Sequence, residues 1–414
     1  MNQTLDIVVQ KYGGTSVGDV EKMKNVARRI AAVRSEGKQV VAVVSAMGKT
    51  TDELVSLARQ MHKDPPRREM DLLLSVGEQI SIALLSMALH DLGYPAISLL
   101  GHQAGILTDG NFANAHIQRV ERNRILKHLQ EGKIVLVAGF QGASADGEIT
   151  TLGRGGSDLT AVALAAILNA SRCEIFTDVD GIFTTDPRRT PKASLLPFIS
   201  YSEMLELASE GAQVMQTRAV EVARKYNVPL IIRNSFKQNQ GTWIIGDEKL
   251  EKVVITGIAF DKQVAQIRLN DYSKDSRNFL SIFGKLAEEN INIKIIVQGA
   301  SANGNKTISF LVGDEQLELV KSVLDQLQAR RKNFFYEVDT DVAKIAVVGS
   351  GIASTPGTAY RVFQALLESD IPIYSISTSE IKIGCVVPED KAEEAVTVLH
   401  DTFGLESLER KKIA

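Results

Sequence analysis

Over the first 245 residues, short apolar runs alternate with longer stretches in which apolar positions recur at helical spacing. The apolar runs predict strands at Ile7–Val9, Gln39–Val44, Ala96–Leu100, Ile134–Val137, Arg172–Phe176 and Leu230–Arg233. The helical spacing predicts helices at Val20–Ser35, Arg68–Leu92, Asp158–Asn169 and Tyr201–Tyr226. Strands that alternate with helices favour an α/β fold with a mostly parallel sheet between two helical layers, a three-layer αβα sandwich. We therefore expect the chemistry on the loops beyond the carboxyl ends of the strands.

Beyond Trp243 the pattern changes and a weak internal repeat begins. Ser281–Val297 resembles Arg361–Ser377, about 80 positions later, and two shorter matches flank this pair in the same order. Each copy predicts strand, helix, strand, strand, helix, strand, which is the ferredoxin-like βαββαβ plan. Two chance amphipathic segments are the alternative, but three collinear matches favour a duplication. We expect domains at residues 1–245, 262–336 and 341–408.

Composition and charge narrow the class of protein. The 414 residues are 44% hydrophobic and 23% charged, with a net charge of −3, so no basic excess favours nucleic acid or an anionic membrane as a partner. The two cysteines, Cys173 and Cys385, offer neither a disulfide framework nor a zinc site. The N-terminus lacks the charged and apolar regions of a signal peptide, and Leu5–Gln10 predicts a first strand instead. The apolar stretch Leu159–Leu168 is too short to cross a membrane. We expect a cytoplasmic protein.

The first motif with chemical content is Lys11–Gly18, directly after the first predicted strand. Gly13 and Gly14 let the backbone approach an anion, and successive N–H groups before a helix form a phosphate cradle. Lys11 would supply positive charge to a transferred phosphoryl group. The spacing is not that of a Walker loop. A simple tight turn explains the two glycines equally well.

The second motif, Thr150–Asp158, contains three glycines, Arg154, Ser157 and Asp158 immediately before a predicted helix. Arg154 has the geometry to hold a carboxylate with two hydrogen bonds. Ser157 or Asp158 as a plain helix N-cap is the alternative, but an N-cap needs neither the arginine nor the glycines.

The third motif, Thr177–Arg188, follows a buried strand and contains several aspartates. Asp178 and Asp180 are candidates for ribose or metal contacts, and Arg188 for a phosphate contact. The alternative is a polar turn, because Asp-Gly and Asp-Pro both favour turns.

Two further stretches complete the set. Ser45–Glu53 leaves the second strand with several hydroxyls, and Glu78 interrupts an apolar helical stretch. A buried glutamate is rare unless it is paired, so Glu78 is a candidate acceptor for an ammonium group, with a helix-surface carboxylate as the alternative. The sequence shows no Ser/His/Asp constellation for hydrolysis and no zinc or EF-hand pattern. The inventory suits phosphoryl transfer without a protein nucleophile.

With these motifs in order, the chain resembles the aspartate kinases of the amino-acid kinase superfamily. The resemblance is carried by the segments KYGGTSVG, VVSAMGKTTDEL, SVGEQIS, VAGFQG, TTLGRGGSD and TDVDGIFTTDPR. The repeats resemble the paired ACT domains through which such enzymes sense amino-acid end products. The resemblance implies phosphorylation of the L-aspartate side chain by ATP with Mg²⁺, in the biosynthesis of lysine, threonine and methionine.

The resemblance also assigns roles to residues. The catalytic residues would be Lys11, Asp158 and Arg154, with Asp158 organising Lys11 and the transferred group. ATP would contact Lys11, Tyr12, Gly13, Gly14, Ser45, Thr177, Asp178, Phe183, Asp186, Pro187 and Arg188. Aspartate would contact Lys49, Thr50, Thr51, Asp52, Glu53, Glu78, Arg154 and Ser157, with 49–53 as a loop. Gln298 and Thr378, at matched positions of the repeats, would contact the effector, lysine or threonine or both. No residue is expected to be a dedicated metal ligand, and a homodimer or higher oligomer through the ACT domains is expected.

Two departures from the family pattern stand out. Gln213 occupies a position where many members have a lysine that approaches the nucleotide, and Lys274–Asn278 lacks the glycine expected of an effector loop. Two alternative functions remain open: a kinase for glutamate or N-acetylglutamate, and an inactive amino-acid sensor. The presence together of Lys11, Glu78, Arg154 and Asp158 argues against the sensor.

Overall fold

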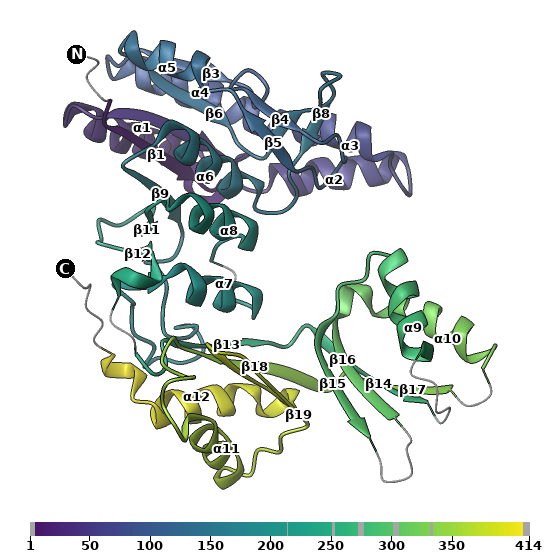
Figure 1. The fold of residues 1–414 in the computed structure, drawn as a ribbon. Helices are drawn as coiled ribbons and strands as arrows, with labels where there is room; N and C mark the ends of the chain where they lie inside the picture. The colour runs from purple at the N-terminus through teal and green to yellow at the C-terminus, as the bar shows by residue number, and fades with distance from the viewer. Residues whose placement is uncertain are drawn as a thin grey trace.

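The computed structural model describes residues 5–212, 214–250, 253–271, 277–300, 306–331 and 334–408 (Figure 1). Gln213 and residues 274–276, on which two sequence interpretations depend, lie outside these ranges. An α/β domain forms one end of the molecule, and two smaller α/β units lie at the other end (Figure 1).

The large domain is built on an eight-stranded, mostly parallel sheet. Its strands, in spatial order, are β10 (Phe198–Ser200), β12 (Thr242–Ile245), β11 (Leu230–Asn234), β9 (Arg172–Thr177), β1 (Ile7–Tyr12), β2 (Gln39–Val44), β6 (Ile134–Ala138) and β3 (Ala96–Leu99). All six strands predicted from the sequence are in this sheet, and the antiparallel pair is β11 with β12. The chain passes to β2 on one side of β1 and to β9 on the other, so a crevice opens at the carboxyl ends of these strands.

Helices cover both faces of this sheet. The helices of the domain are α1 (Val20–Ser35), α2 (Thr50–Met61), α3 (Arg67–Leu74), α4 (Val76–Asp91), α5 (Asn123–Gln130), α6 (Gly156–Leu168), α7 (Tyr201–Ser209) and α8 (Thr217–Tyr226), of which α2 and α3 pack on each other and not on this sheet. One apolar core lies between the sheet and α1 with α4, and the other between the sheet and α5, α6, α7 and α8. The strands are apolar on both faces for this reason, as the sequence pattern predicted.

Two helices predicted as continuous are broken. The predicted helix Arg68–Leu92 is interrupted at Ser75, whose carbonyl oxygen accepts a hydrogen bond from Gln141 Nε2 at 2.8 Å. The predicted helix Tyr201–Tyr226 ends at Ser209, because Gly211 (φ 110°) adopts a conformation that does not continue a helix. Residues 210–216 then lead to α8. Neither interruption changes the apolar spacing, so periodicity alone does not reveal it.

A small four-stranded sheet beside the main one was not predicted. It contains β5 (Ile117–Val120), β4 (Ile106–Thr108), β7 (Gln141–Ala143) and β8 (Ile149–Thr151) in that order. Strands of three or four residues show too few alternations for a pattern to be recognised. This sheet matters because β8 leads directly into the glycine-rich motif at residues 153–156.

The first repeat unit follows the predicted ferredoxin-like plan. It runs β14 (Val264–Asp271), α9 (Arg277–Glu288), β15 (Lys294–Ala300), β16 (Lys306–Gly313), α10 (Leu317–Gln328) and β17 (Phe334–Asp339). Its sheet has the order β15-β16-β14-β17, with all neighbours antiparallel.

The second repeat unit departs from the predicted order of elements. It contains β18 (Val342–Val348), α11 (Thr358–Glu368), β19 (Ser375–Thr378), β20 (Lys382–Pro388) and α12 (Ala392–Thr402). Its sheet has the order β13-β18-β20-β19, and β13 (Gly257–Asp261) precedes the first unit in the chain. The strand expected after α12 is thus supplied from before β14, so the first unit is inserted within the second.

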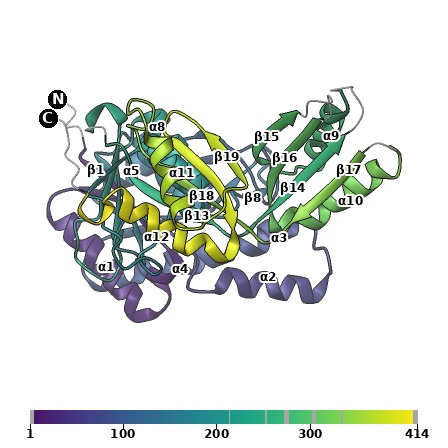
Figure 2. The same ribbon diagram turned by 90° about the horizontal axis from the view of Figure 1, so that it is seen from below.

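The second unit lies against the large domain, and the first lies to its side (Figures 1 and 2). Helix α7 contacts β18 and β13, and α12 packs beside β13. Together α3 and α4 form the one helical stretch in the described ranges that is long and apolar enough to cross a membrane. The buried side chains of α4 pack against α1, β3 and β6, an arrangement typical of a core helix.

Candidate active site

Lys11 and Asp158 form an ion pair at the carboxyl end of the central strand. Lys11 Nζ lies 2.8 Å from Asp158 Oδ1, and the two side chains are 13% and 9% exposed. Lys11 is fixed because β1 pairs with β2 on one side and β9 on the other. Asp158 lies in the first turn of α6, where the helix dipole favours a negative charge. The pair brings together two predicted residues that are far apart in sequence.

The glycine motif after β1 is joined to the loop after β2. Gly48 N donates to Gly14 O at 3.0 Å, and Ser45 N donates to Tyr12 O at 3.0 Å. Gly14–Val17 forms a short 3₁₀ helix. Ser16 Oγ lies 2.5 Å from Ser235 Oγ, which connects this turn to the end of β11. These bonds fix the glycine turn and the loop after β2 side by side at the carboxyl edge of the sheet, where a helical turn begins, which is the position in which a phosphate cradle is expected.

Glu78 is buried without a cationic partner among the described residues. Its Oε1 accepts a hydrogen bond from Ala46 N at 3.0 Å, while Oε2 is buried and has no hydrogen-bond partner. Burial raises the pKa of Glu78 to about 7, although the backbone hydrogen bonds oppose this shift. The prediction that Glu78 is buried is confirmed. A buried carboxylate with one unpartnered oxygen is a ready acceptor for a cationic ligand group.

The second motif begins α6. The helix N-cap is Gly155, so Ser157 and Asp158 lie within the first turn, and the interpretation of either as a plain N-cap is wrong. Ser157 is buried and its Oγ lies beside Gly139 at the end of β6. Arg154 is exposed at the tip of the loop. The motif therefore places Arg154, whose guanidinium has no partner among the residues that the structure describes, at the start of the helix that carries Asp158.

The third motif lines a cavity of about 690 Å³ between the large domain and the second repeat unit. One wall contains Thr177, Asp178, Phe183 and the run Asp186–Arg188, and the facing wall contains residues 258–263 of the β13–β14 region. Asp186 pairs with Arg188 at 2.9 Å, and hydrogen bonds from Arg188 hold the pKa of Asp186 below its usual range. The carboxylate of Asp180 instead holds Asn234 and Lys237, which orders the loop from β11.

Some predicted contacts take a different form. Tyr12 is fully buried and stacks on Phe176 with ring centroids 4.8 Å apart, so only its backbone faces the crevice. The stretch Lys49–Glu53 is not a loop, because α2 begins at Thr50. Within it the Thr50 side chain lies beside Gly77, next to Glu78, whereas Asp52 and Glu53 are exposed. The pattern Thr50-x-x-Glu53 resembles a capping box and so indicates a helix start in the sequence, but the N-cap of α2 is Lys49, one residue earlier, and no side chain caps it.

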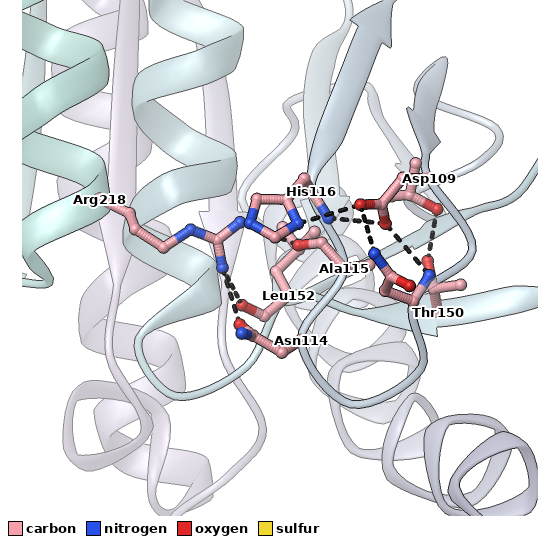
Figure 3. Close-up of polar contacts among 9 residues, drawn as sticks. Asp109, Asn114, Ala115, His116, Thr150, Leu152 and Arg218 are labelled. Atoms are coloured by element: carbon pink, nitrogen blue, oxygen red, sulfur yellow. Dashed lines mark hydrogen bonds and ion pairs between the residues drawn. The ribbon is translucent and has the colours of Figure 1, made fainter. Parts of the chain in front are cut away.

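Sequence analysis missed four residues that shape the site. Phe140 has φ of 68°, unusual for an aromatic residue, and lies against Gly156. Asp71 is fully buried and accepts hydrogen bonds from Thr151 N and Oγ1. Gln216 and Arg218 hold the loop that carries Arg154, and Figure 3 shows the contacts of Arg218. Gly139 directly before Phe140 and Gly142 two residues after it were the one available signal; the other three residues lie in ordinary helical sequence.

The two candidate effector residues lie on edge strands. Gln298 is exposed on β15 and Thr378 is exposed on β19, each at the edge of its own sheet. These two strands contact each other across the boundary between the units. Beside them, Gln266 Nε2 donates to Ser375 Oγ at 2.9 Å.

Family patterns match both parts of the chain. The amino acid kinase family matches residues 6–234, and the ACT domain matches residues 280–327 and 345–403. The chain is 48% identical over 402 residues to an aspartokinase of Geobacillus stearothermophilus, covering 97% of this chain and 98% of that protein. It is 46% identical over 405 residues to an aspartokinase of Helicobacter pylori, covering 97% and 100%.

Solved structures agree with the sequence matches. The structure of E. coli aspartokinase III in complex with aspartate and ADP matches with a TM-score of 0.80 and 26% identity. The match covers 96% of this chain and 99% of that one. The same enzyme in complex with lysine and aspartate matches with a TM-score of 0.76 and 26% identity, over 96% and 99% of the two chains.

Proposed function

The chain belongs to the aspartokinases of the amino acid kinase family, and from this membership we propose how its residues perform the reaction. The protein is an aspartate kinase, a phosphotransferase that uses ATP to phosphorylate the side-chain carboxylate of L-aspartate. The observation that carries the residue assignment is the buried Lys11–Asp158 pair, 2.8 Å apart, beside a backbone cradle for phosphates.

The reaction needs no general base from the protein. The carboxylate of aspartate, with a pKa of about 4, is already ionised at neutral pH and is a competent nucleophile. Catalysis then consists of positioning two anionic reactants and neutralising charge on the transferred group. Lys11 supplies the positive charge, and Asp158 holds its ammonium group in place. The turn at Gly13 and Gly14 and the hydroxyl of Ser45 receive the phosphates.

The aspartate site is proposed to lie between Glu78 and Arg154. The unpartnered Oε2 of Glu78 accepts the α-ammonium group, and the exposed guanidinium of Arg154 clamps a carboxylate of the substrate. Ser157 and the first turn of α2 complete this site. The nucleotide contacts Thr177, Asp178, Phe183 and Asp186–Arg188 along the cavity wall.

Mg²⁺ is proposed as the partner of ATP. The donor set fits an ion that arrives with the nucleotide, because the cavity wall offers carboxylate oxygens, which are ligands that Mg²⁺ takes. Phosphate oxygens would supply most ligands, with Asp178 the acidic side chain at the cavity wall. When bound, the ion neutralises phosphate charge.

Regulation is proposed to come from an amino acid bound at the ACT units. Lysine is the first candidate, because a relative of this fold has been solved with lysine and aspartate, and threonine is the second. Gln298 and Thr378 are the proposed contacts. We also propose a homodimer or higher oligomer through the ACT units, a cytoplasmic location, and a division into residues 1–245, 262–336 and 341–408. β13 belongs with the last range in space.

The test of the assignment is ADP release with each of three acids in turn. Aspartate should support turnover, whereas glutamate and N-acetylglutamate should not. Glu78→Gln should raise the KM for aspartate without an equal change for ATP. A turnover that prefers glutamate would overturn the substrate assignment, and an unchanged KM for aspartate in Glu78→Gln would overturn the role of Glu78.

A further inference from the structure

The loop that carries Arg154 is held in a conformation that its own residues do not fix. Gly153 and Gly155 on either side of Arg154 are left-handed, with φ of 77° and 71°. Within the described residues, the guanidinium of Arg154 forms no hydrogen bond or ion pair. Because glycine is free to adopt many conformations, the direction of Arg154 depends on contacts from outside the loop.

Gln216 makes one such contact at Arg154 itself. Its Nε2 donates to the carbonyl oxygen of Arg154 at 2.7 Å, and its Cβ and Cγ pack against Gly155. Gln216 occupies the N-cap position of α8, yet its side chain forms no capping hydrogen bond. Its Oε1 is also buried without a hydrogen-bond partner in the described structure. The side chain of Gln216 therefore stabilises the neighbouring loop and does not cap its own helix.

Arg218, in the first turn of α8, holds the same loop two residues upstream (Figure 3). Its Nη1 donates to Leu152 O at 2.9 Å and to Asn114 Oδ1 at 3.0 Å, and its Nη2 donates to Ala115 O at 2.9 Å. Figure 3 shows the guanidinium extended from the helix toward these three acceptors. A planar guanidinium reaches acceptors from two segments at fixed angles, which a lysine does not reproduce.

We infer that Gln216 and Arg218 are positioning residues for aspartate binding, which set the backbone at Arg154 and act on the substrate only through that arginine. The inference rests on the proposed role of Arg154 as the carboxylate clamp. A bidentate clamp tolerates little displacement, so a loosened loop weakens aspartate binding. The proposed nucleotide contacts follow β9 on a different loop, so the KM for ATP is expected to change little.

The first test is Gln216→Met, which keeps the length of the side chain and removes the donor. We expect the KM for aspartate to rise about tenfold and the KM for ATP to change less than about twofold. Gln316→Met is the matched control, since Gln316 Nε2 also donates to a backbone carbonyl, that of Asn290, in the first repeat unit. If Gln216→Met does not fold, Gln216→Glu keeps the shape and replaces the donor with an acceptor.

A double-mutant cycle separates a positioning role from a general structural one. Arg154→Lys should by itself raise the KM for aspartate. On that background Gln216→Met should add less than about a further twofold, because the group that it positions is already lost. If the two effects instead multiply, the inference is wrong. If Arg154→Lys leaves the KM unchanged, the proposed clamp is wrong, and the two failures are thus distinguishable.

Arg218 is tested in parallel with Arg218→Lys, which keeps the positive charge but removes the planar guanidinium that reaches two segments at once. The KM for aspartate should rise several-fold, again without an equal rise for ATP. Arg122→Lys is the control, because Arg122 Nη1 donates to Ile167 O near the far end of α6. An equal rise in both KM values, or an equal effect from the control, would overturn the role of Arg218.

Discussion

At the residue scale, two largely buried charged residues of the candidate site, Lys11 and Glu78, differ in whether they have a partner. Lys11 already has a counter-ion in Asp158, whereas Glu78 has one carboxylate oxygen without a partner in the described structure. In the proposed mechanism, this pairing holds the ammonium group of Lys11 in one position for the transferred phosphoryl group. Glu78 is instead proposed to pair with the ammonium group of the bound aspartate, which supplies the opposite charge. The difference in pairing thus corresponds to the difference between transition-state and substrate recognition.

Glu78 should make aspartate binding depend on pH near neutrality. Its pKa is raised to about 7 by burial, so the carboxylate that accepts the ammonium group is ionised above that pH and protonated below it. The KM for aspartate should rise as pH falls from 8 to about 6, and Glu78→Gln should have a high KM that no longer depends on pH in this range. Initial rates at fixed saturating ATP measure this. An unchanged profile in Glu78→Gln would assign the titration to another group.

The same carboxyl should affect stability in the absence of substrate. The unfolded state loses this proton near pH 4.5 and the folded state near 7, so the unfolded state binds fewer protons between these values. The free energy of unfolding should therefore fall as pH rises from about 4.5 to 7, by an amount on the order of 3 kcal/mol. Urea denaturation across this range, compared with Glu78→Gln, measures the difference. A decrease of the same size in the variant would contradict the assignment.

Lys11 should act mainly on the chemical step. Lys11→Met should lower kcat by about a hundredfold or more while the KM for aspartate changes little, because the charge is needed most as the phosphoryl moves. Lys38→Met is the control: Lys38 pairs with Asp6 at 2.7 Å near the opposite end of the same sheet. A rise in the KM for ATP without a fall in kcat would mean that Lys11 only binds nucleotide.

At the scale of elements, the loop between β9 and β10 carries the proposed nucleotide contacts and joins the cavity that they line to helix α12. Thr184 Oγ1 and His400 Nε2 lie 2.9 Å apart in a fully buried contact. Around it, Arg189 pairs with Glu393, and Lys192 pairs with Asp401 at 3.0 Å. Arg189 also lies over the ring of Phe260 on β13. The loop between β9 and β10 is therefore held by the second repeat unit as well as by its own domain.

Removing the buried contact should loosen the loop between β9 and β10. His400→Phe should raise the KM for ATP several-fold and leave the KM for aspartate nearly unchanged, because Thr184 then loses its buried partner. His90→Phe, at an exposed histidine that contacts Ala96 O, is the control. Steady-state kinetics and thermal denaturation should be measured on both. An effect confined to the KM for aspartate would contradict the idea that His400 acts on ATP binding through the loop between β9 and β10.

Much of the fold was predictable because buried parallel strands are continuous apolar runs, and all six predicted strands lie in the main sheet. The helix breaks at Ser75 and Gly211, the short strands of the small sheet and the placement of β13 were not predictable, since each depends on contacts with distant segments. In the candidate site, Lys11 and Asp158 were predicted because they lie in glycine-rich motifs, and the structure brings the two together. Gln216 and Arg218 were missed because they act through backbone atoms of another segment.

At the scale of the whole molecule, a buried cluster of charges joins α7 to the sheet of the second repeat unit. Lys344 pairs with Glu210, and Lys382 lies 2.9 Å from both Glu206 and Glu210. Burial, the largest influence, lowers the pKa of Lys344. The pKa of Lys382 is also lowered by burial, but its hydrogen bonds to the two glutamates outweigh this and raise it. Gln216, which contacts the Arg154 loop, follows Glu210 of this cluster by six positions in the sequence.

Breaking this cluster should weaken feedback regulation more than catalysis. Lys344→Met leaves Glu210 with one partner fewer in a buried place, so stability should fall by a few kcal/mol. The concentration of lysine or threonine needed for half inhibition should rise at least about fivefold, with kcat less affected. Lys321→Met, which removes an exposed pair with Glu318, is the control. Unchanged inhibition in Lys344→Met would exclude the cluster from the regulatory route.

The central claim is that this site phosphorylates the side chain of L-aspartate. The most direct measurement traps aspartyl phosphate with hydroxylamine in the presence of ATP, Mg²⁺ and L-aspartate, with and without lysine and threonine. The account predicts hydroxamate formation that requires aspartate, is lost in Lys11→Met, and falls when an effector amino acid is added. Hydroxamate from glutamate or another acid, and none from aspartate, would contradict it.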